Sequence, residues 1–402
     1  MKRSIALVFL ALSVLCLKLN AQSKSTPELR QKTFEKIWQI ANDKFWDQTL
    51  GGVDWNGAKK RYAPQVAAVK TDAEFYSLMN KMLGELKTSH MGIISPDTIS
   101  SYKKVPTLTG IGSRELDGKV VVTHVFAGSS AAEAGIKPGF VLAKIDGSAI
   151  TKFSDAQTKL QGDANTTLKL TYLDGEDVSH EVTMDRRPLA GDDKSKLAGI
   201  SFYGLFDSKR LDGNIGYFYF SNFLEFLNPK IKTAVESMHD APGMIIDLRG
   251  NSGGDDSVGV KMASLFFDKE TLLMVTKTRK GDVLDYKAKP PKSPYGGKVV
   301  ILIDEFSMSA SEQFAAGMQE SGRAVVVGNK TPGSDMDGEL EGLPDGSVML
   351  YAYGQPRTPK GYIVEGNGIK PNIEVALTRN GLLNGHDAQL EAAIEYIKKN
   401  AK

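Results

Sequence analysis

A serine stands where a strand-like run gives way to a helical pattern. The apolar residues 299–303 lead into Asp304, and the segment Ser-Ala-Ser-Glu at 309–312 opens a stretch with helical spacing. A hydroxyl at such a turn can act as a nucleophile, because the N–H groups that follow it point at the negative charge that develops during attack. The same place suits a helix N-cap at Ser309 or Ser311, with Glu312 completing a capping box, so local spacing leaves both interpretations open.

A glycine-rich turn follows a second apolar run, residues 244–248. Residues 249–254 read Arg-Gly-Asn-Ser-Gly-Gly and precede another helical pattern. Backbone N–H groups at such a helix start can bind phosphate or stabilise an oxyanion. The phosphate interpretation is weak, because the segment has neither a Gly-Lys-Ser/Thr ending nor a GxGxxG pattern.

A histidine ends the helical region in the segment Leu-Lys-Thr-Ser-His at 86–90. Histidine is the usual general base for a serine nucleophile, but a lone histidine is more often structural, so His90 alone does not indicate catalysis. The histidines show no ligand spacing such as HExxH, so we expect no metal-dependent mechanism and no cofactor. They are His90, His124, His180, His239 and His386.

Composition restricts the partners and the compartment. The chain of 402 residues carries 50 basic and 48 acidic residues, a balance that indicates neither a nucleic acid nor an anionic membrane surface as partner. Residues 1–21 have a basic start, an apolar run and a small residue at Ala21, which predicts a secretory signal, with an uncleaved anchor as the alternative. Cys16 is the only cysteine, so the exported chain would form no disulfide. We expect no stable membrane span after signal removal, because no later segment reaches about 18 apolar residues.

The elements that must position these residues change character along the chain. Residues 22–98 show helical periodicity and predict an N-terminal helical domain. Residues 105–188 contain β-branched runs separated by Gly and Pro turns and predict a mainly β domain. From 195 to 402, strands at about 213–220, 244–248, 299–303, 324–328 and 348–353 alternate with helical patterns, which predicts an α/β domain.

The β segment resembles a PDZ domain of the bacterial, circularly rearranged kind. The resemblance rests on Thr109-Gly110-Ile111-Gly112, on the run Ser-Ala-Ala-Glu-Ala-Gly-Ile-Lys-Pro-Gly at 130–139, and on Ile-Asp-Gly at 145–147. It implies a groove that takes a peptide as an added strand, with N–H groups near Gly110, Ile111 and Gly112 holding a terminal carboxylate or a carbonyl. The alternative is that these glycines only form a turn.

The ordered set of segments over nearly the whole chain resembles the C-terminal processing peptidase family, which also contains the tricorn core proteases. The matching segments are Ser89-His90, Asp-Leu-Arg-Gly-Asn-Ser-Gly-Gly at 247–254, Ser-Met-Ser-Ala-Ser-Glu at 307–312, Gly322 to Gly328, Thr-Pro-Gly at 331–333, and Val-Glu-Gly-Asn-Gly-Ile-Lys-Pro at 364–371. The resemblance implies a crotonase/ClpP-like α/β spiral core. It places the nucleophile on Ser309, one oxyanion donor on Ala310, the other in the loop of Gly253 and Gly254, and the helix cap on Ser311.

One position departs from the pattern of many members. They use a serine–lysine dyad with the lysine soon after Thr-x-Gly, and here that position is Ser334. The sequence instead resembles the tricorn-type branch, which implies His90 as general base, supported by Ser89 and oriented by Glu365. The order of these contacts stays open.

The expected function is that of an exported serine endopeptidase, periplasmic or extracellular, acting on unfolded or C-terminal segments of polypeptides. The missing lysine motivates an alternative: a catalytically inactive receptor that binds peptides with its PDZ groove. No oligomeric state follows from the sequence.

Overall fold

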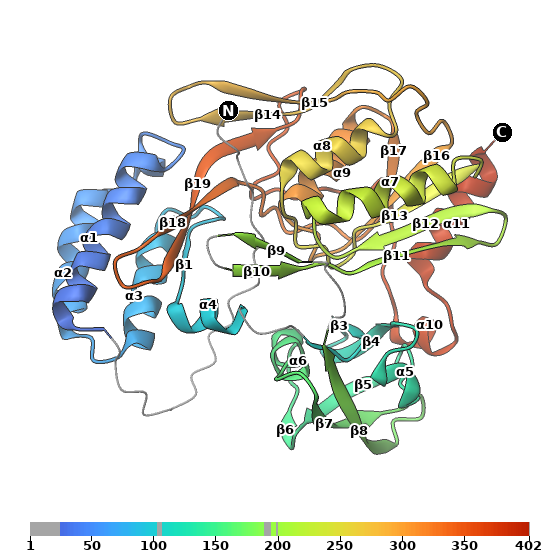
Figure 1. Cartoon of the computed structure of the whole chain (residues 1–402), viewed down its shortest axis with the longest axis horizontal. Coiled ribbons are helices and arrows are strands. Elements are labelled where there is room, and N and C mark those ends of the chain that lie inside the picture. The colour runs from blue at the N-terminus through green and yellow to red at the C-terminus, as the bar shows by residue number, and fades with distance from the viewer. Residues whose placement is uncertain (1–24, 103–106, 189–193, 198–199, 402) are drawn as a thin grey trace. The chain divides into compact units, whose positions relative to one another are not determined.

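The computed structural model of the chain describes residues 25–102, 107–188, 194–197 and 200–401 (Figure 1). The expected signal, residues 1–21, lies outside the described residues. The described chain forms two compact units. The first contains the residues up to 101, residues 195–374 and those from 396 onward; the second contains residues 102–194 and 375–395. Within the described chain, no helix combines the length and apolar character needed to span a bilayer.

Three helices begin the first unit: α1 (Pro27–Lys44), α2 (Trp55–Ala68) and α3 (Asp72–Gly84). The helical character expected for this region is confirmed. Thr71 and Glu74 form a capping box that starts α3. The apolar faces of the helices pack in one buried cluster with β19 (Val348–Arg357). After α3 the chain enters β1 (Gly92–Ile94), which pairs with the same strand through Gly92 opposite Leu350. The end of the helical region is therefore tied to the rest of the unit just beside His90.

A six-stranded sheet forms the centre of the first unit, in the order β11-β12-β13-β16-β17-β20. β11 is antiparallel to β12, and the strands from β12 to β20 run parallel to one another. Its strands are β11 (Phe206–Leu211), β12 (Ile215–Phe220), β13 (Gly243–Asp247), β16 (Lys298–Ile303), β17 (Ala324–Gly328) and β20 (Ile373–Glu374). The helices α7 (Asn228–Ser237), α8 (Asp256–Ser264) and α9 (Ala310–Glu320) share its apolar core. The alternation of strands and helices expected from the sequence is confirmed.

This topology brings distant turns together. The carboxyl ends of neighbouring parallel strands lie at one edge of a sheet. The chain leaves β13 into the glycine-rich turn at 249–254, leaves β16 into the segment ending at Ser309, and leaves β17 into residues 329–336. The three turns therefore emerge side by side.

A second sheet in this unit runs β1-β19-β14-β15, with β18 (Asp337–Gly342) also paired to β19. Its strands β14 (Thr271–Thr278) and β15 (Val283–Ala288) were not predicted from the sequence. The remaining short elements of the chain are η1 (Leu50–Gly52), α4 (Pro96–Tyr102), β9 (Lys194–Leu197), β10 (Ile200–Tyr203) and η2 (Glu225–Leu227).

The second unit is mainly β, with strand order β2-β8-β7-β5-β4-β3 and β6 paired to β5. Its strands are β2 (Thr107–Leu108), β3 (Ile111–Leu116), β4 (Lys119–Val125), β5 (Val141–Ile145), β6 (Ser148–Ala149), β7 (Thr166–Leu173) and β8 (Ser179–Pro188). Its helices are α5 (Ser130–Glu133), α6 (Phe153–Leu160), α10 (Arg379–Leu383) and the first part of α11 (Ala388–Asn400).

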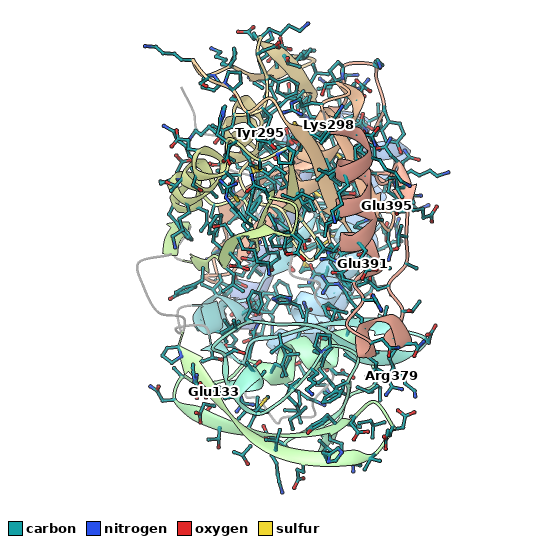
Figure 2. All side chains as sticks on the ribbon, turned by 90° about the vertical axis from the view of Figure 1, so that its right-hand side faces the viewer. Glu133, Tyr295, Lys298, Arg379, Glu391 and Glu395 are labelled. Carbon is teal, nitrogen blue, oxygen red and sulfur yellow. The ribbon has the colours of Figure 1, made fainter. Side chains whose placement is uncertain are left out.

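Residues 375–395 belong with this β unit, although they lie in the segment expected to be the α/β domain. Arg379 extends from α10 (Figure 2) and donates hydrogen bonds to Gly139 O at 2.9 Å and Asp174 O at 2.7 Å. Leu382 packs with Val121 and Val141. The mixed α/β class is confirmed; the PDZ identity, the spiral arrangement and the domain boundaries stay predictions.

Candidate active site

His90 and Ser309, which are 219 positions apart in the sequence, lie side by side. Nε2 of the histidine is 3.2 Å from Oγ of the serine. Both residues are buried, with 0% and 1% of their surface exposed. Pairing of β1 with β19 positions the histidine, and the turn from β16 into α9 positions the serine. A base and a hydroxyl at this separation meet the geometric requirement for proton transfer.

Ser89 connects the histidine to a carboxylate. Its hydroxyl oxygen lies 2.8 Å from Nδ1 of His90, and its hydroxyl donates to Oε2 of Glu365 at 2.7 Å. Glu365 also accepts the backbone N–H groups of Ser89 and Asp335, each at 2.7 Å. The contact order that the sequence left open therefore runs from Ser309 through His90 and Ser89 to Glu365.

This order assigns the tautomer of the imidazole. Ser89 has a single hydroxyl hydrogen, and it is donated to Glu365. The serine oxygen can then only accept from the histidine, so Nδ1 of His90 carries the hydrogen and Nε2 is left as an acceptor facing Ser309. The hydrogen-bond chain thus presents a proton-accepting nitrogen to the hydroxyl of Ser309.

The backbone at both residues is in the left-handed region, with φ of 56° at His90 and 54° at Ser309. Such a conformation costs about 1–3 kcal/mol for a residue other than glycine and persists only where surrounding contacts hold it. The N–H of Ser309 donates to Ser334 O at 2.9 Å and lies 3.2 Å from a carboxylate oxygen of Glu312. These contacts keep the serine at the sharp turn, where it is the N-cap residue of α9 and its hydroxyl lies beside Nε2 of the histidine.

Burial determines the protonation state of the histidine. It lowers the pKa of His90 to about 3. The imidazole is therefore neutral at pH 7, which is the form that can accept a proton.

The glycine-rich turn touches the nucleophile. A Cβ added at Gly253 would lie 2.7 Å from Cβ of Ser309 and 3.0 Å from the backbone nitrogen of Ala310. The N–H of Gly253 itself donates to Oδ1 of Asn251 at 3.0 Å. The N–H groups of Ala310 and Gly254 donate to no acceptor among the described residues. The N–H of Gly254 in the turn and the N–H of Ala310 at the start of α9 are thus available as donors, whereas the N–H of Gly253 is already occupied.

Ser311 does not cap α9, contrary to the expectation. Its hydroxyl is buried and lies 2.8 Å from Asn251 O and 2.9 Å from Asn251 Oδ1. The side chain therefore ties the helix to the glycine-rich turn. The role of Asn251 in joining these two segments was not predicted, because it depends on strands that are distant in sequence meeting at one edge.

Glu312 supports the turn from the other side. Its carboxylate accepts hydrogen bonds from the side chain of Thr331 and from the N–H groups of Gly333 and Ser334, both at 2.8 Å. Burial nevertheless raises the pKa of Glu312 to about 7. Ser334 accepts the N–H of Ser309 with its carbonyl.

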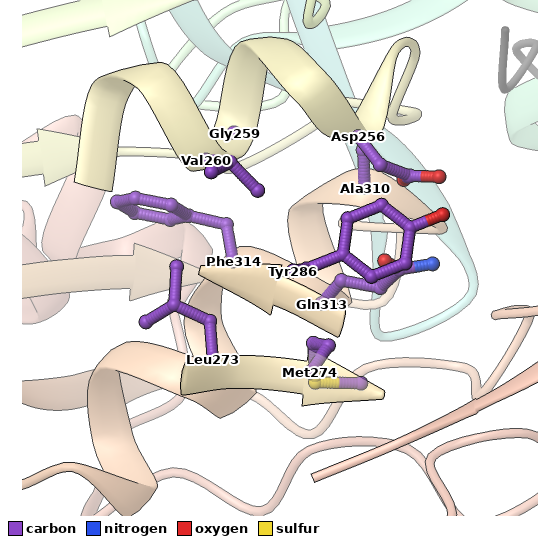
Figure 3. Close-up of a pocket in the computed structure, with 9 residues that line it drawn as sticks. All are labelled: Asp256, Gly259, Val260, Leu273, Met274, Tyr286, Ala310, Gln313 and Phe314. Atoms are coloured by element: carbon purple, nitrogen blue, oxygen red, sulfur yellow. The ribbon is translucent and has the colours of Figure 1, made fainter. Parts of the chain in front are cut away.

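A pocket lies beside Ala310, between helices α8 and α9 and strands β14 and β15 (Figure 3). Apolar side chains form one end and polar groups form the other. The lining residues are Asp256, Gly259, Val260, Leu273, Met274, Tyr286, Ala310, Gln313 and Phe314. Among the described residues, no group of three or more His, Cys, Asp or Glu side chains is arranged to hold a metal ion.

The residues expected to bind peptide lie in the second unit. Gly110 has a φ of 86° and its carbonyl accepts the N–H of Phe126 at 2.9 Å. Ile111 and Gly112 begin β3, the last strand in the order of that sheet, and α6 packs against the same strand. A strand at the sheet edge can pair with an added peptide.

Comparisons with known proteins agree with the resemblance. Residues 214–375 match the model of peptidase family S41, and residues 27–84 match that of the tricorn protease C1 domain. The chain is 25% identical over 381 residues to a carboxyl-terminal-processing protease of Synechocystis sp., covering 91% of this chain and 86% of that protein. It is 27% identical over 359 residues to the chloroplastic carboxyl-terminal-processing peptidase 3 of Arabidopsis thaliana, covering 86% and 68%. The solved photosystem II D1 C-terminal processing protease shares the fold, with a TM-score of 0.60 at 20% identity over 90% of this chain and 98% of that one.

Proposed function

Because this chain belongs to peptidase family S41, which consists of serine-type peptidases, we propose that it cleaves peptide bonds with Ser309 as nucleophile and His90 as general base. The observation that carries this assignment is the continuous hydrogen-bond chain from Ser309 through His90 and Ser89 to Glu365. A serine hydroxyl needs a base to become an effective nucleophile, and the neutral imidazole supplies one.

In the proposed reaction, Oγ of Ser309 attacks the carbonyl carbon of the scissile bond while its proton passes to Nε2 of His90. The positive charge on the imidazolium is stabilised through Nδ1–H and Ser89 by the carboxylate of Glu365. The N–H groups of Ala310 and Gly254 stabilise the negative oxygen of the tetrahedral intermediate. His90 then gives the proton to the departing amine, and a water molecule, activated by the same base, releases the acyl group from Ser309.

The substrates we propose are unfolded or C-terminal segments of exported polypeptides. The edge strand β3, with Gly110, Ile111 and Gly112 at its start, supports a PDZ-type role for the second unit in capturing such segments. The basic and apolar start of the sequence supports export to the periplasm or the extracellular space. The alternative, a catalytically inactive receptor, receives no support from the comparisons, and the aligned hydrogen-bond chain argues against it.

A fluorophosphonate probe, which reacts with an activated serine, tests the assignment. The wild-type chain should be labelled at Ser309, as located by mass spectrometry of the digested protein, and Ser309→Ala should not. His90→Ala should slow labelling by several powers of ten, because the base is lost. A folded wild-type protein that neither reacts with the probe nor cleaves an unfolded polypeptide would refute the proposed function.

A further inference from the structure

Asp256 begins helix α8, two residues after the glycine-rich turn that touches Ser309. Its side chain lines the polar end of the pocket, near Ala310, Gln313 and Tyr286 (Figure 3). The residue is 8% exposed, and its buried Oδ1 has no hydrogen-bond partner among the N–H and O–H groups of the described residues. A carboxyl group in this situation requires an explanation, because an unpaired buried acceptor is strongly destabilising.

Asp337 lies close to Asp256, because Gln313 and Tyr286 line the pocket together with Asp256 and both donate to the carboxylate of Asp337. It is fully buried at the start of β18, and donors surround it. Its Oδ1 accepts from Nε2 of Gln313 at 2.8 Å, and its Oδ2 accepts from the hydroxyls of Thr276 at 2.6 Å and Tyr286 at 3.2 Å. Three donors favour the ionised form of Asp337, so in a shared-proton pair the proton belongs on Asp256.

We propose that Asp256 carries a proton that it donates to the carboxylate of Asp337. This hydrogen bond fixes the position of the glycine-rich turn relative to the start of α9, which follows Ser309. Asp256 follows the turn that contains Gly254, while Asp337 holds Gln313 in the first turn of α9, directly after Ser309. Asp256 is thus a positioning residue for the two backbone donors. The inference rests on the proposed function, since it assigns those donors to an oxyanion.

The link is sensitive to pH because removing its proton leaves two buried carboxylates facing each other. Burial raises the pKa of Asp256 well above its usual range, and the charges of Asp337 and Asp255 raise it further. Burial also raises the pKa of Asp337 to about 6, against the lowering effect of its hydrogen-bond donors. The other titratable groups around the pair are Tyr286 on β15, Tyr353 on β19, Asp335 before β18 and Glu312 on α9.

The test compares two substitutions at Asp256. Asp256→Asn keeps a donor toward Asp337 but cannot titrate, whereas Asp256→Leu keeps the branching at Cγ without any donor. Rates of Ser309 labelling and kcat for an unfolded polypeptide are measured from pH 5 to pH 10. We expect the wild-type rate to fall on the alkaline side, Asp256→Asn to abolish that fall, and Asp256→Leu to lose about 10- to 100-fold in kcat at every pH. Asp285→Asn, an exposed carboxyl on β15 paired with Lys287, is the matched control and should behave as wild type.

Infrared difference spectra provide a readout that does not depend on activity. At pH 8 the wild-type protein should show the band of a protonated carboxyl group that Asp256→Asn lacks. The unfolding free energy of Asp256→Asn relative to wild type should increase as pH rises above about 4, because only the wild type must retain the extra proton. An equal alkaline fall in Asp256→Asn, an unchanged kcat in Asp256→Leu, or the absence of the infrared difference would each overturn the proposal. If the wild-type protein had no peptidase activity, the infrared spectra and the unfolding free energies would still decide whether the shared proton exists.

Discussion

Ser89 donates its hydroxyl hydrogen to Glu365 at 2.7 Å, and this one contact determines how the neighbouring imidazole is oriented. Because the donated hydrogen is no longer available, the serine oxygen accepts from Nδ1 of His90, and Nε2 is the acceptor that faces Ser309. The carboxylate therefore acts on the histidine only through a hydroxyl group.

Replacing this relay should impair the chemical step and not substrate binding. Ser89→Ala removes the acceptor for Nδ1–H, so the correct tautomer and the stabilisation of the imidazolium are both weakened. We expect kcat to fall by about 10- to 1000-fold with little change in KM. Ser101→Ala, at an exposed serine of α4, is the control and should keep the wild-type kcat. A rise in KM at constant kcat would assign Ser89 to binding.

Burial of the imidazole predicts an unusual dependence of the reaction rate on pH on the acidic side. Since the pKa of His90 is lowered to about 3, the base stays neutral well below the usual histidine range. We expect the rate of Ser309 labelling to show no titration near pH 6.5 that is attributable to His90. A half-maximal rate at about 6.5 that disappears in His90→Gln would contradict the buried, neutral state of the free enzyme.

The same lowered pKa makes a prediction for stability. Between pH 6.5 and 3 the unfolded chain protonates this histidine while the folded chain does not, so the unfolded state binds more protons. The folded state should lose stability as pH falls through this window, by up to about 1.4 kcal/mol per pH unit for one group. His90→Gln should remove this component, as measured by denaturant unfolding of both proteins at several pH values. An identical pH dependence in the two proteins would show that the histidine does not contribute it.

Two substitutions separate the effect of close packing around Gly253 from the effect of its positive φ. A methyl group at this position meets Ser309 and Ala310, and the φ of 94° is also unfavourable for alanine. Gly253→Ala should therefore reduce kcat by about 100-fold or more, because it displaces the nucleophile and an oxyanion donor. Gly281→Ala is a matched control, since Gly281 has a similar φ of 84° and open space around its Cβ position. Equal kcat in the two variants would show that the turn does not need close approach.

Gly110→Asp should weaken peptide capture. The added negative charge near the proposed carboxylate site is one reason, and a steric clash of the new side chain is a second. An added Cβ would lie 2.1 Å from both Cβ and Oγ of Ser129, so any side chain at this position displaces the start of α5. Gly118→Asp has a comparable positive φ with no neighbouring atoms and is the control. Binding of a fluorescent peptide with a free C-terminus should be lost only in the first variant. Equal KM values for substrates with free and amidated C-termini would exclude terminal-carboxylate recognition.

Local periodicity predicted several of the elements around the proposed site, and the order of the segments supplied the resemblance from which its residues were named. The strand at 299–303, the helix after Ser309 and the helices α1 and α3 follow from local periodicity, because neighbours in sequence produce these patterns. Ser309, His90, Ser89 and Glu365 were named from motif resemblance and are joined by hydrogen bonds in the structure.

What only the tertiary structure decided depends on contacts between distant segments. The resemblance implied Ser311 as the helix cap, but its hydroxyl donates to the carbonyl of Asn251, which follows a neighbouring strand. The contact order through Ser89, the lowered pKa of His90 and the pairing of Asp256 with Asp337 arise because parallel strands bring turns to one buried edge. Burial and proximity of this kind leave no periodic trace in the sequence, so no local pattern could have predicted them.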